Sequence, residues 1–176
     1  MSARANLPEE FNQALRKFTY GFYILTTRKK AEELSQRSED YIAAGTVSWV
    51  SQVSFTPPLV MVAVQKQSDL NETISKSRVF ALNFIGSANQ QLIQAFGGKT
   101  AVSDDALNGF SFENGATGSP LLAACPLAIE CHLVDAIHTQ GDHVLFIGRV
   151  ESVTIRDENA KLVTDQEIGH VYGGTK

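Results

Sequence analysis

Residues 45–58 read GTVSWVSQVSFTPP, a stretch that places hydroxyl side chains beside the only tryptophan of the chain and ends at two prolines. Polar and apolar side chains alternate along it with the two-residue period of a half-buried strand, and the polar set is Thr46, Ser48, Gln52 and Ser54. Val50 and Ser51 interrupt the alternation. Such an interruption predicts a bulge or a sharp bend that turns hydroxyl and backbone N–H groups toward one place. A place of this kind suits a flat cofactor with polar edges.

The sequence on either side of this stretch predicts a mainly β protein with a few helices. Strands are expected at residues 22–27, 59–64, 79–85, 110–112, 127–137 and 144–155. A short polar turn at residues 139–142 joins the last two. Many strands, few helices and no strand-helix-strand alternation indicate an antiparallel barrel rather than a doubly wound sheet.

Short helices are expected beside the sheet. Residues 7–18 carry apolar side chains at helical spacing and a proline near the start. Two further helices are predicted to begin at residue pairs with capping-box spacing, Asp69 with Glu72 and Ser87 with Gln90. Gly97 and Gly98 are expected to end the last of these helices. The charged segment 28–40 predicts a solvated excursion between two strands.

Length and composition bound the class of protein. The chain has 176 residues, 43% of them hydrophobic, and we expect a single domain over residues 1–176. The formal charge is -4 and acidic residues follow the only basic run, residues 28–30, which argues against nucleic-acid binding. No apolar run reaches the roughly 18 residues that cross a bilayer, so no membrane association is expected. The N-terminal residues lack the apolar core of a secretion signal, which predicts a cytoplasmic protein.

Motifs of several common chemistries are absent from the sequence. Gly98-Lys99-Thr100 matches the end of a phosphate-binding loop, but Ile93 stands where the first glycine is required. Neither G-x-G-x-x-G nor G-x-S-x-G occurs, so a Rossmann site and a hydrolase elbow have no support. Cys125 and Cys131 are too few for a disulfide framework and are expected to be reduced and packed. Adjacent Cys131 and His132 would point to opposite faces of a strand, so no metal site is expected.

An ordered series of short motifs runs through most of the chain. It comprises FTYG at 18–21, SWVSQVSFTPPLVMVAVQK at 48–66, RVFALN at 78–83, FGGK at 96–99, GSP at 118–120, Cys131 and GDH at 141–143. In this order the motifs resemble those of flavin reductase-like proteins over residues 11–174. The SWVSQVSF stretch with a C-terminal Tyr172-Gly173-Gly174 is most similar to flavoredoxin-type members and to the flavin reductase module of cyanobacterial flavodiiron proteins.

The resemblance implies a fold, a cofactor and partners. The expected fold is an antiparallel split β-barrel, Greek-key-like, with short flanking helices. The expected cofactor is FMN, with FAD as an alternative, and the expected electron donor is NADH or NADPH. The resemblance also implies a homodimer with the flavin near the subunit interface, and a monooxygenase or a redox protein as the electron acceptor.

Residues suited to each part of FMN can be named. For the phosphate, Ser68 precedes a helix start whose N–H groups favour anions, and Lys66 and Lys99 add positive charge. The family comparison also puts Ser68 and Lys99 near the cofactor. For the ring and the ribityl chain, the bend and the resemblance together indicate Thr46, Ser48, Trp49, Val50 and Ser51.

Three more residues enter through the resemblance. It places Asn83 and Tyr172 among the cofactor contacts, and it gives His143 a catalytic position near the flavin face where the nicotinamide docks. Structural alternatives stay open at this point: Ser68 as a helix cap, Trp49 as a core aromatic, Asn83 as a turn-facing or water-bonded amide and His143 as an exposed turn histidine.

The favoured function is that of an FMN-dependent oxidoreductase, in which hydride passes from NADH or NADPH to flavin and electrons go on to an acceptor. A second hypothesis is a non-enzymatic FMN electron carrier that receives electrons from a protein partner. A third is a split barrel that has a structural role or binds haem or another ligand without flavin. The colour of the purified protein separates the third from the others, and anaerobic bleaching by NAD(P)H separates the first from the second.

Overall fold

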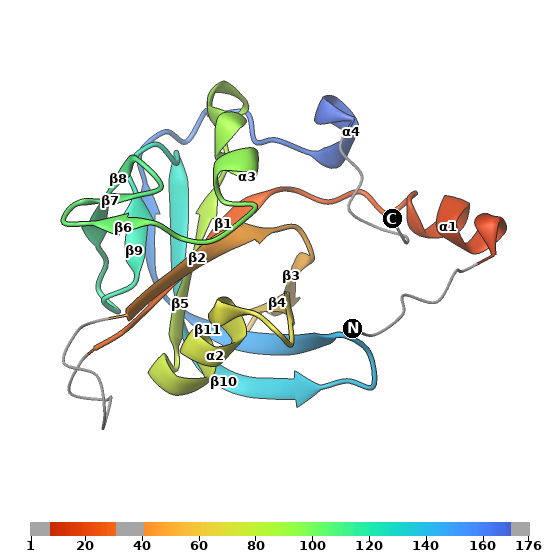
Figure 1. Ribbon diagram of the computed structural model, residues 1–176, viewed down its shortest axis with the longest axis horizontal. Helices are drawn as coiled ribbons and strands as arrows, with labels where there is room; N and C mark the ends of the chain where they lie inside the picture. Colours follow the sequence, from red (N-terminus) through yellow and green to blue (C-terminus); the bar gives the residue numbers. More distant parts are fainter. Residues whose placement is uncertain (1–7, 31–40, 170–176) are drawn as a thin grey trace.

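Eleven strands form two antiparallel sheets in the computed structural model, which describes residues 8–30 and 41–169 (Figure 1). The larger sheet contains β1 (Tyr23–Lys29), β2 (Tyr41–Val47), β3 (Val50–Ser54), β4 (Leu59–Gln65), β5 (Val79–Phe84), β10 (Leu127–His138) and β11 (His143–Ile155). Its strand order is β2-β1-β5-β10-β11-β4-β3. The smaller sheet contains, in spatial order, β6 (Val102–Ser103), β7 (Ala106–Leu107), β8 (Phe110–Asn114) and β9 (Pro120–Leu122).

The helices are short and lie outside the sheets. They are α1 (Glu9–Leu15), α2 (Asp69–Ser77), the 3₁₀-helix η2 (Ser87–Asn89), α3 (Gln91–Ala95) and α4 (Asp165–Ile168). In Figure 1, α1 stands apart from the body of the molecule, whereas α2 packs against β1 and β2. Among the helices of the described ranges, none is long and apolar enough to cross a membrane.

The mainly β, antiparallel architecture predicted from the sequence is confirmed by the strand pairing. The continuous apolar run at residues 59–64 forms β4, with Val62 and Val64 in a core cluster that also contains Leu70 and Ile74 of α2. A run that is apolar at every position requires cover on both faces, and α2 contributes to that cover. This packing fixes the start of α2 next to the end of β4.

A second core cluster lies on the other face of β1. Because successive strand residues point to opposite faces, β1 contributes Leu25 to the first cluster and Ile24 to the second. Leu92 of α3 and Phe96 just beyond it belong to the second cluster. The segment that follows α3 is therefore held against the β1–β2 edge of the sheet.

The stretch at residues 45–58 forms two strands rather than one strand with a bulge. β2 ends at Val47 and pairs with β1, whereas β3 begins at Val50 and pairs with β4. The predicted bend therefore exists, but it falls at Ser48 and Trp49 and not at Val50 and Ser51. Polar and apolar side chains still alternate through Ser48 and Trp49, so the alternation alone could not locate the break between β2 and β3.

Helix starts differ in detail from the predicted capping boxes. Ser68, not Asp69, is the N-cap of α2, and its side chain accepts a hydrogen bond from Asn71 N. The second predicted box, at Ser87, is wrong because the chain forms η2 there and α3 follows without a side-chain cap. Residues 28 and 29 of the charged segment belong to β1, and residues 31–40 lie outside the described ranges.

Candidate functional site

A cavity of about 540 Å³ opens where β2 ends and the chain bends toward β3. This volume lies within the roughly 300–1,000 Å³ of ordinary small-molecule sites. The wall is formed by Phe22 and four segments: the end of β2 with the bend, the end of β4 with the first turn of α2, residues 93–100, and the start of β11. The cavity brings together six of the residues predicted from the sequence, Thr46, Ser48, Trp49, Ser68, Lys99 and His143.

Ser48 and Trp49 turn the chain from one strand to the next. Val50 N donates to Ser48 O at 3.1 Å, and Ala63 N donates to Trp49 O at 3.0 Å, which ties the bend to β4. β2 and β3 stand at the two ends of the strand order, so this short connection crosses the opening of the sheet. Both side chains of the bend line the cavity.

The hydroxyl of Ser48 lacks a hydrogen-bond partner. The residue is 4% exposed, and its Oγ is one of two buried side-chain polar atoms in the described ranges that have no partner. Leaving a buried hydroxyl unsatisfied costs about 1–3 kcal/mol. Because Ser48 lines the cavity, a ligand with a hydrogen-bonding edge would remove this cost.

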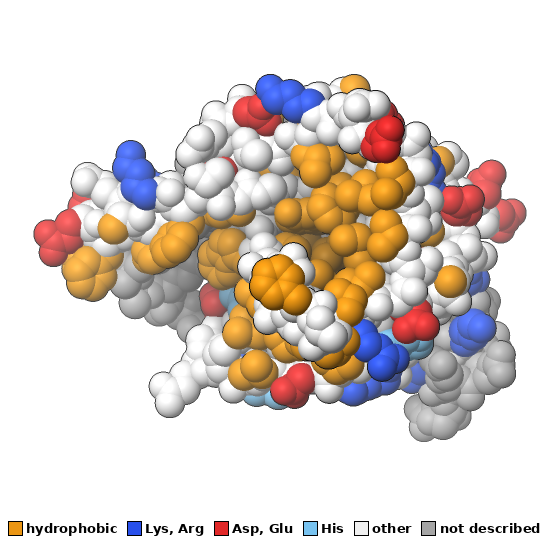
Figure 2. Space-filling model, turned by 180° about the vertical axis from the view of Figure 1, so that it is seen from behind, with side chains coloured by type: hydrophobic (Ala, Val, Ile, Leu, Met, Phe, Trp, Pro, Cys, Tyr) orange, Lys and Arg blue, Asp and Glu red, His pale blue; other side chains and the backbone are white. Residues whose placement is uncertain are grey.

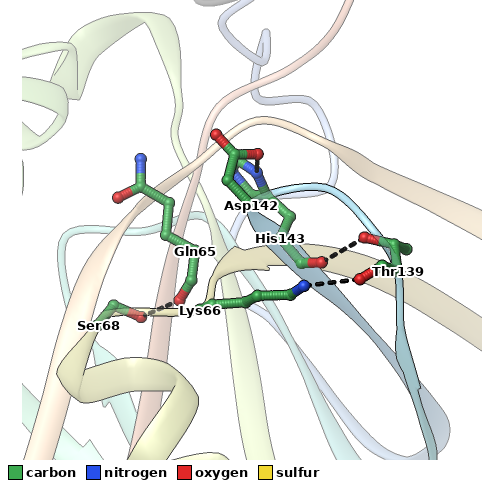
Figure 3. Close-up of polar contacts among 6 residues, drawn as sticks. All are labelled: Gln65, Lys66, Ser68, Thr139, Asp142 and His143. Atoms are coloured by element: carbon green, nitrogen blue, oxygen red, sulfur yellow. Dashed lines mark hydrogen bonds and ion pairs between the residues drawn. The ribbon is translucent and has the colours of Figure 1, made fainter. Parts of the chain in front are cut away.

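An imidazole and an indole ring lie together in the cavity wall. The ring centroids of Trp49 and His143 are 4.9 Å apart, and the ring planes are inclined by 46°. His143 Nδ1 lies 2.6 Å from Asp142 Oδ1 (Figure 3). Because an ionised carboxylate only accepts hydrogen bonds, this contact assigns the proton to Nδ1 and leaves Nε2 as the ring nitrogen that can serve a ligand.

The start of α2 and the loop after α3 provide groups that attract anions. Ser68 Oγ accepts from Asn71 N at 3.2 Å and donates to Gln65 O at 2.8 Å. The remaining N–H groups of the first turn favour an anion, although Asp69 also lines this end of the cavity. Lys99 is exposed and lies in the wall, and no described carboxylate forms an ion pair with it.

α3 and the loop after it are attached along the outer edge of β2. Thr46 Oγ1 donates to Ile93 O at 2.8 Å, and Thr46 N donates to Phe96 O at 3.0 Å. Ala44, two residues before Thr46 in β2, is bonded to Thr100: Thr100 Oγ1 accepts from Ala44 N at 3.0 Å and donates to Ala44 O at 2.9 Å. Thr46 therefore lines the cavity, but the proton of its hydroxyl group is already donated to Ile93 O. Thr100 belongs to this wall and was not predicted, because its partner backbone lies 56 positions away in the sequence.

Several predicted contacts lie outside the cavity wall. Val50 and Ser51 are in β3, and Ser51 Oγ donates to the neighbouring Gln52 O at 3.1 Å. The ammonium group of Lys66 donates to Thr139 O at 2.6 Å, so it is bonded to the turn between β10 and β11. Tyr172 lies outside the described residues.

Asn83 is a core residue of β5. Its Nδ2 donates to Ile24 O and to Thr26 Oγ1, both at 3.1 Å, and its Oδ1 accepts from Leu122 N at 2.8 Å. The residue is fully buried and does not line the cavity. The amide of Asn83 joins β1 and β5 to β9, and the cofactor contact expected of this residue is not among those that the cavity wall offers.

The two thiols are buried and unpaired, as expected from their spacing. Burial raises the pKa of Cys125 to about 12, with Arg156 acting in the opposite direction. Burial also raises the pKa of Cys131 to about 12, and the carboxylate of Glu130 adds to the effect. Within the described ranges, no group of three His, Cys, Asp or Glu side chains is placed to hold a metal ion.

Comparisons with known proteins agree with this geometry. The family model described as "Flavin reductase like domain" matches residues 15–171. The reductase subunit HsaB of a flavin-dependent monooxygenase from Rhodococcus jostii is 28% identical over 163 residues, which cover 92% of this chain and 77% of that protein. The FMN reductase (NADH) RutF of Bradyrhizobium diazoefficiens is 25% identical over 139 residues, which cover 79% and 72% respectively. The native-state structure of flavin reductase PheA2 superposes with a TM-score of 0.71 at 25% identity, covering 90% of this chain and 92% of that one.

Proposed function

The chain belongs to the family of flavin reductase-like domains, and from this membership we propose that it is an FMN-dependent oxidoreductase that takes electrons from NADH or NADPH. The observation that carries the proposal is the unpartnered Ser48 hydroxyl in a cavity that also holds the Trp49–His143 ring pair. A relative named as an FMN reductase that uses NADH supports the choice of FMN, with FAD as the alternative flavin.

The residues of the cavity fit the parts of FMN. Trp49 would cover part of the aromatic ring, and the Ser48 hydroxyl would bond to a polar group of the ring edge or the ribityl chain. The start of α2 and Lys99 would receive the phosphate. When bound, the flavin supplies the redox chemistry: it takes a hydride from NAD(P)H and one proton, and reduced flavin and NAD(P)+ result.

His143 provides the titratable ring of the site. With Nδ1–H directed at Asp142, the neutral ring offers a lone pair at Nε2, and the protonated ring offers an N–H at the same atom. The ring is held beside Trp49, and its side chain is 11% exposed, so water has limited access to it. His143 can therefore orient a ligand or balance negative charge at one defined atom.

We further propose that the protein is a homodimer. Hydrophobic side chains gather over the middle of the face shown in Figure 2. Trp49 of the cavity wall is 37% exposed, and Val53 and Phe55, which follow it in the sequence, are 50% and 89% exposed; exposed apolar surface marks an interaction site where it is contiguous. A second copy covering this surface would bring the interface near the flavin. Light scattering that gives the mass of a monomer would contradict the proposal.

The electron acceptor and the location in the cell are also proposals. A relative named as the reductase subunit of a monooxygenase supports a monooxygenase component as the acceptor, with a redox protein as the alternative. The cytoplasm remains the expected location of the protein. A single domain over residues 1–176 remains the expectation.

Anaerobic stopped-flow measurement of flavin absorbance tests the function. The FMN-loaded protein is mixed with NADH and, separately, with NADPH, and the rate of bleaching is recorded. His143→Asn is expected to retain FMN and to be reduced more slowly. The matched control is His132→Asn, because His132 is exposed on β10 and does not line the cavity.

Each outcome of this experiment has a meaning. If the protein retains FMN but neither nucleotide bleaches it, the oxidoreductase hypothesis is wrong and the protein is an FMN electron carrier that takes electrons from a protein. Failure of calorimetry to detect any FMN binding would reject both and leave a barrel without flavin. Equal bleaching rates for His143→Asn and the unmodified protein would remove the role of His143.

A further inference from the structure

The turn between β10 and β11 is bonded to a single lysine. Lys66 follows β4 directly, and its backbone N donates to Asp142 O at 2.9 Å. Its ammonium group donates to Thr139 O at 2.6 Å (Figure 3). Thr139 in turn donates through Oγ1 to His143 O at 2.8 Å. One residue thus contacts both ends of the 139–142 turn, and the turn contacts the backbone of His143.

The same lysine is joined to α2. Asn71 Nδ2 donates to Lys66 O at 2.7 Å, and Ser68 Oγ donates to Gln65 O at 2.8 Å. The end of β4 is therefore fixed by side chains of the helix start on one side and bonded to the turn on the other. Lys66 itself is partly buried and is not part of the cavity wall.

These contacts disagree with a phosphate-binding role for Lys66. A lysine that serves a phosphate has its ammonium group free for the site, and the exposed Lys99 of the cavity wall meets this condition. The ammonium group of Lys66 is instead bonded to a carbonyl of the turn, and a charge-assisted bond of this length is among the stronger ones. Binding a phosphate would require that bond to break.

We propose that Lys66 is a positioning residue, which fastens the 139–142 turn to the end of β4 and thereby holds His143 in the cavity wall. The proposal rests on the proposed function, since it assigns Lys66 an effect on the reaction through His143. β4 and β11 pair as far as Gln65 and His143, and Lys66 extends the connection beyond this last pair. A turn without this support would let the imidazole and Asp142 move relative to Trp49.

The effect expected on the reaction follows from geometry. Displacing a group that contacts the reacting partners by about 1 Å can lower a rate by as much as about 100-fold. Lys66→Met retains the aliphatic part of the side chain and removes the donor. We expect it to slow reduction of bound FMN by NAD(P)H by about 10-fold to 100-fold, with FMN affinity unchanged. Lys66→Arg, which can still donate to Thr139 O, should restore part of the rate.

Two other lysines make the comparison specific. Lys76→Met is the matched control, because Lys76 is exposed in α2 and pairs with Glu72 of the same helix, away from the turn. It should leave both the rate and the affinity unchanged. Lys99→Met should instead weaken FMN binding, as expected of a phosphate contact.

A double-mutant cycle separates positioning from general loss of structure. In the His143→Asn background, Lys66→Met should add no further decrease in the reduction rate, because the side chain that it positions is already absent. The decrease should appear in kcat at saturating NAD(P)H as well as in kcat/KM. Equal decreases in both backgrounds would overturn the proposal, and so would a higher FMN Kd with a normal reduction rate.

A measurement without turnover keeps the test independent of the reaction. Nitrogen-15 NMR of the imidazole side chains reports the protonated nitrogen of His143, and amide exchange reports protection of the residue-66 N–H that donates to Asp142 O. Lys66→Met should change the His143 signals and speed this exchange, and Lys76→Met should change neither. If the unmodified protein failed to reduce flavin, the proposed function would fall while these signals still decided whether Lys66 holds the turn. Unchanged signals in Lys66→Met would refute the positioning role.

Discussion

Replacing Ser48 by alanine should change the stability of the flavin-free protein and its flavin affinity in opposite directions. In the free protein the buried Oγ lacks a partner, so removing it should raise the free energy of unfolding by about 1 kcal/mol, the lower end of the usual cost of about 1–3 kcal/mol. In a domain of this size, that gain corresponds to a rise of about 2–4 °C in Tm. With FMN bound the hydroxyl has a partner, and losing a hydrogen bond worth about 0.5–1.5 kcal/mol should raise the Kd by about 2-fold to 12-fold.

Two measurements on the same preparation check this expectation. Thermal unfolding of the protein stripped of flavin gives the change in Tm, and calorimetric titration with FMN gives the change in Kd. Ser103→Ala is a suitable control, because Ser103 is exposed in β6, bonds to Ala106 O at 3.3 Å and lies outside the cavity. A lower Tm for flavin-free Ser48→Ala, or an unchanged Kd, would refute the reasoning that the orphaned hydroxyl is reserved for the ligand.

Three further predictions concern the core. Gly148→Ala should lower stability to urea by about 1–3 kcal/mol, because the new Cβ would lie 2.5 Å from Phe80 Cζ and 2.7 Å from Cys131 Cβ; an unchanged urea midpoint would contradict this. Asn83→Ala should cost about 1–3 kcal/mol by leaving Leu122 N without an acceptor, yet calorimetry should show normal FMN affinity. Cys125 and Cys131, with pKa values raised by burial to about 12, should resist alkylation at mildly alkaline pH until the protein is unfolded, and rapid labelling of the native protein would count against this packing.

Local patterns in the sequence predicted the elements that local physics determines. The continuous apolar run at residues 59–64 became β4, and the polar turn at 139–142 joins β10 to β11. The sequence correctly placed Ser68 at a helix start, and in the structure this residue, rather than Asp69, is the N-cap of α2. The strands β6, β7 and β9 were missed because two or three residues are too few to show a period.

Contacts between distant parts of the chain could not be predicted in this way. Lys66 was assigned to phosphate from its charge, but its bond to Thr139 spans 73 positions and depends on how β11 pairs with β4. Asn83 was assigned to the cofactor, yet its acceptor serves Leu122, 39 positions later. A sequence gives the donors and acceptors of a side chain, whereas tertiary pairing decides which of them remain for a ligand.

The position of the site follows from the way the larger sheet ends. An edge strand leaves backbone groups without strand partners, and this protein satisfies those of β2 with Phe96 O and with the side chain of Thr100, which takes both the N–H and the carbonyl of Ala44. A loop that replaces a strand follows the edge less closely than a strand would. Between that loop and the bend at Ser48 the sheet therefore leaves room for a ligand, and the buried hydroxyl of Ser48, a residue of the cavity wall, has no partner among the described residues. The opening of the barrel and the unsatisfied hydrogen bond thus have the same structural origin.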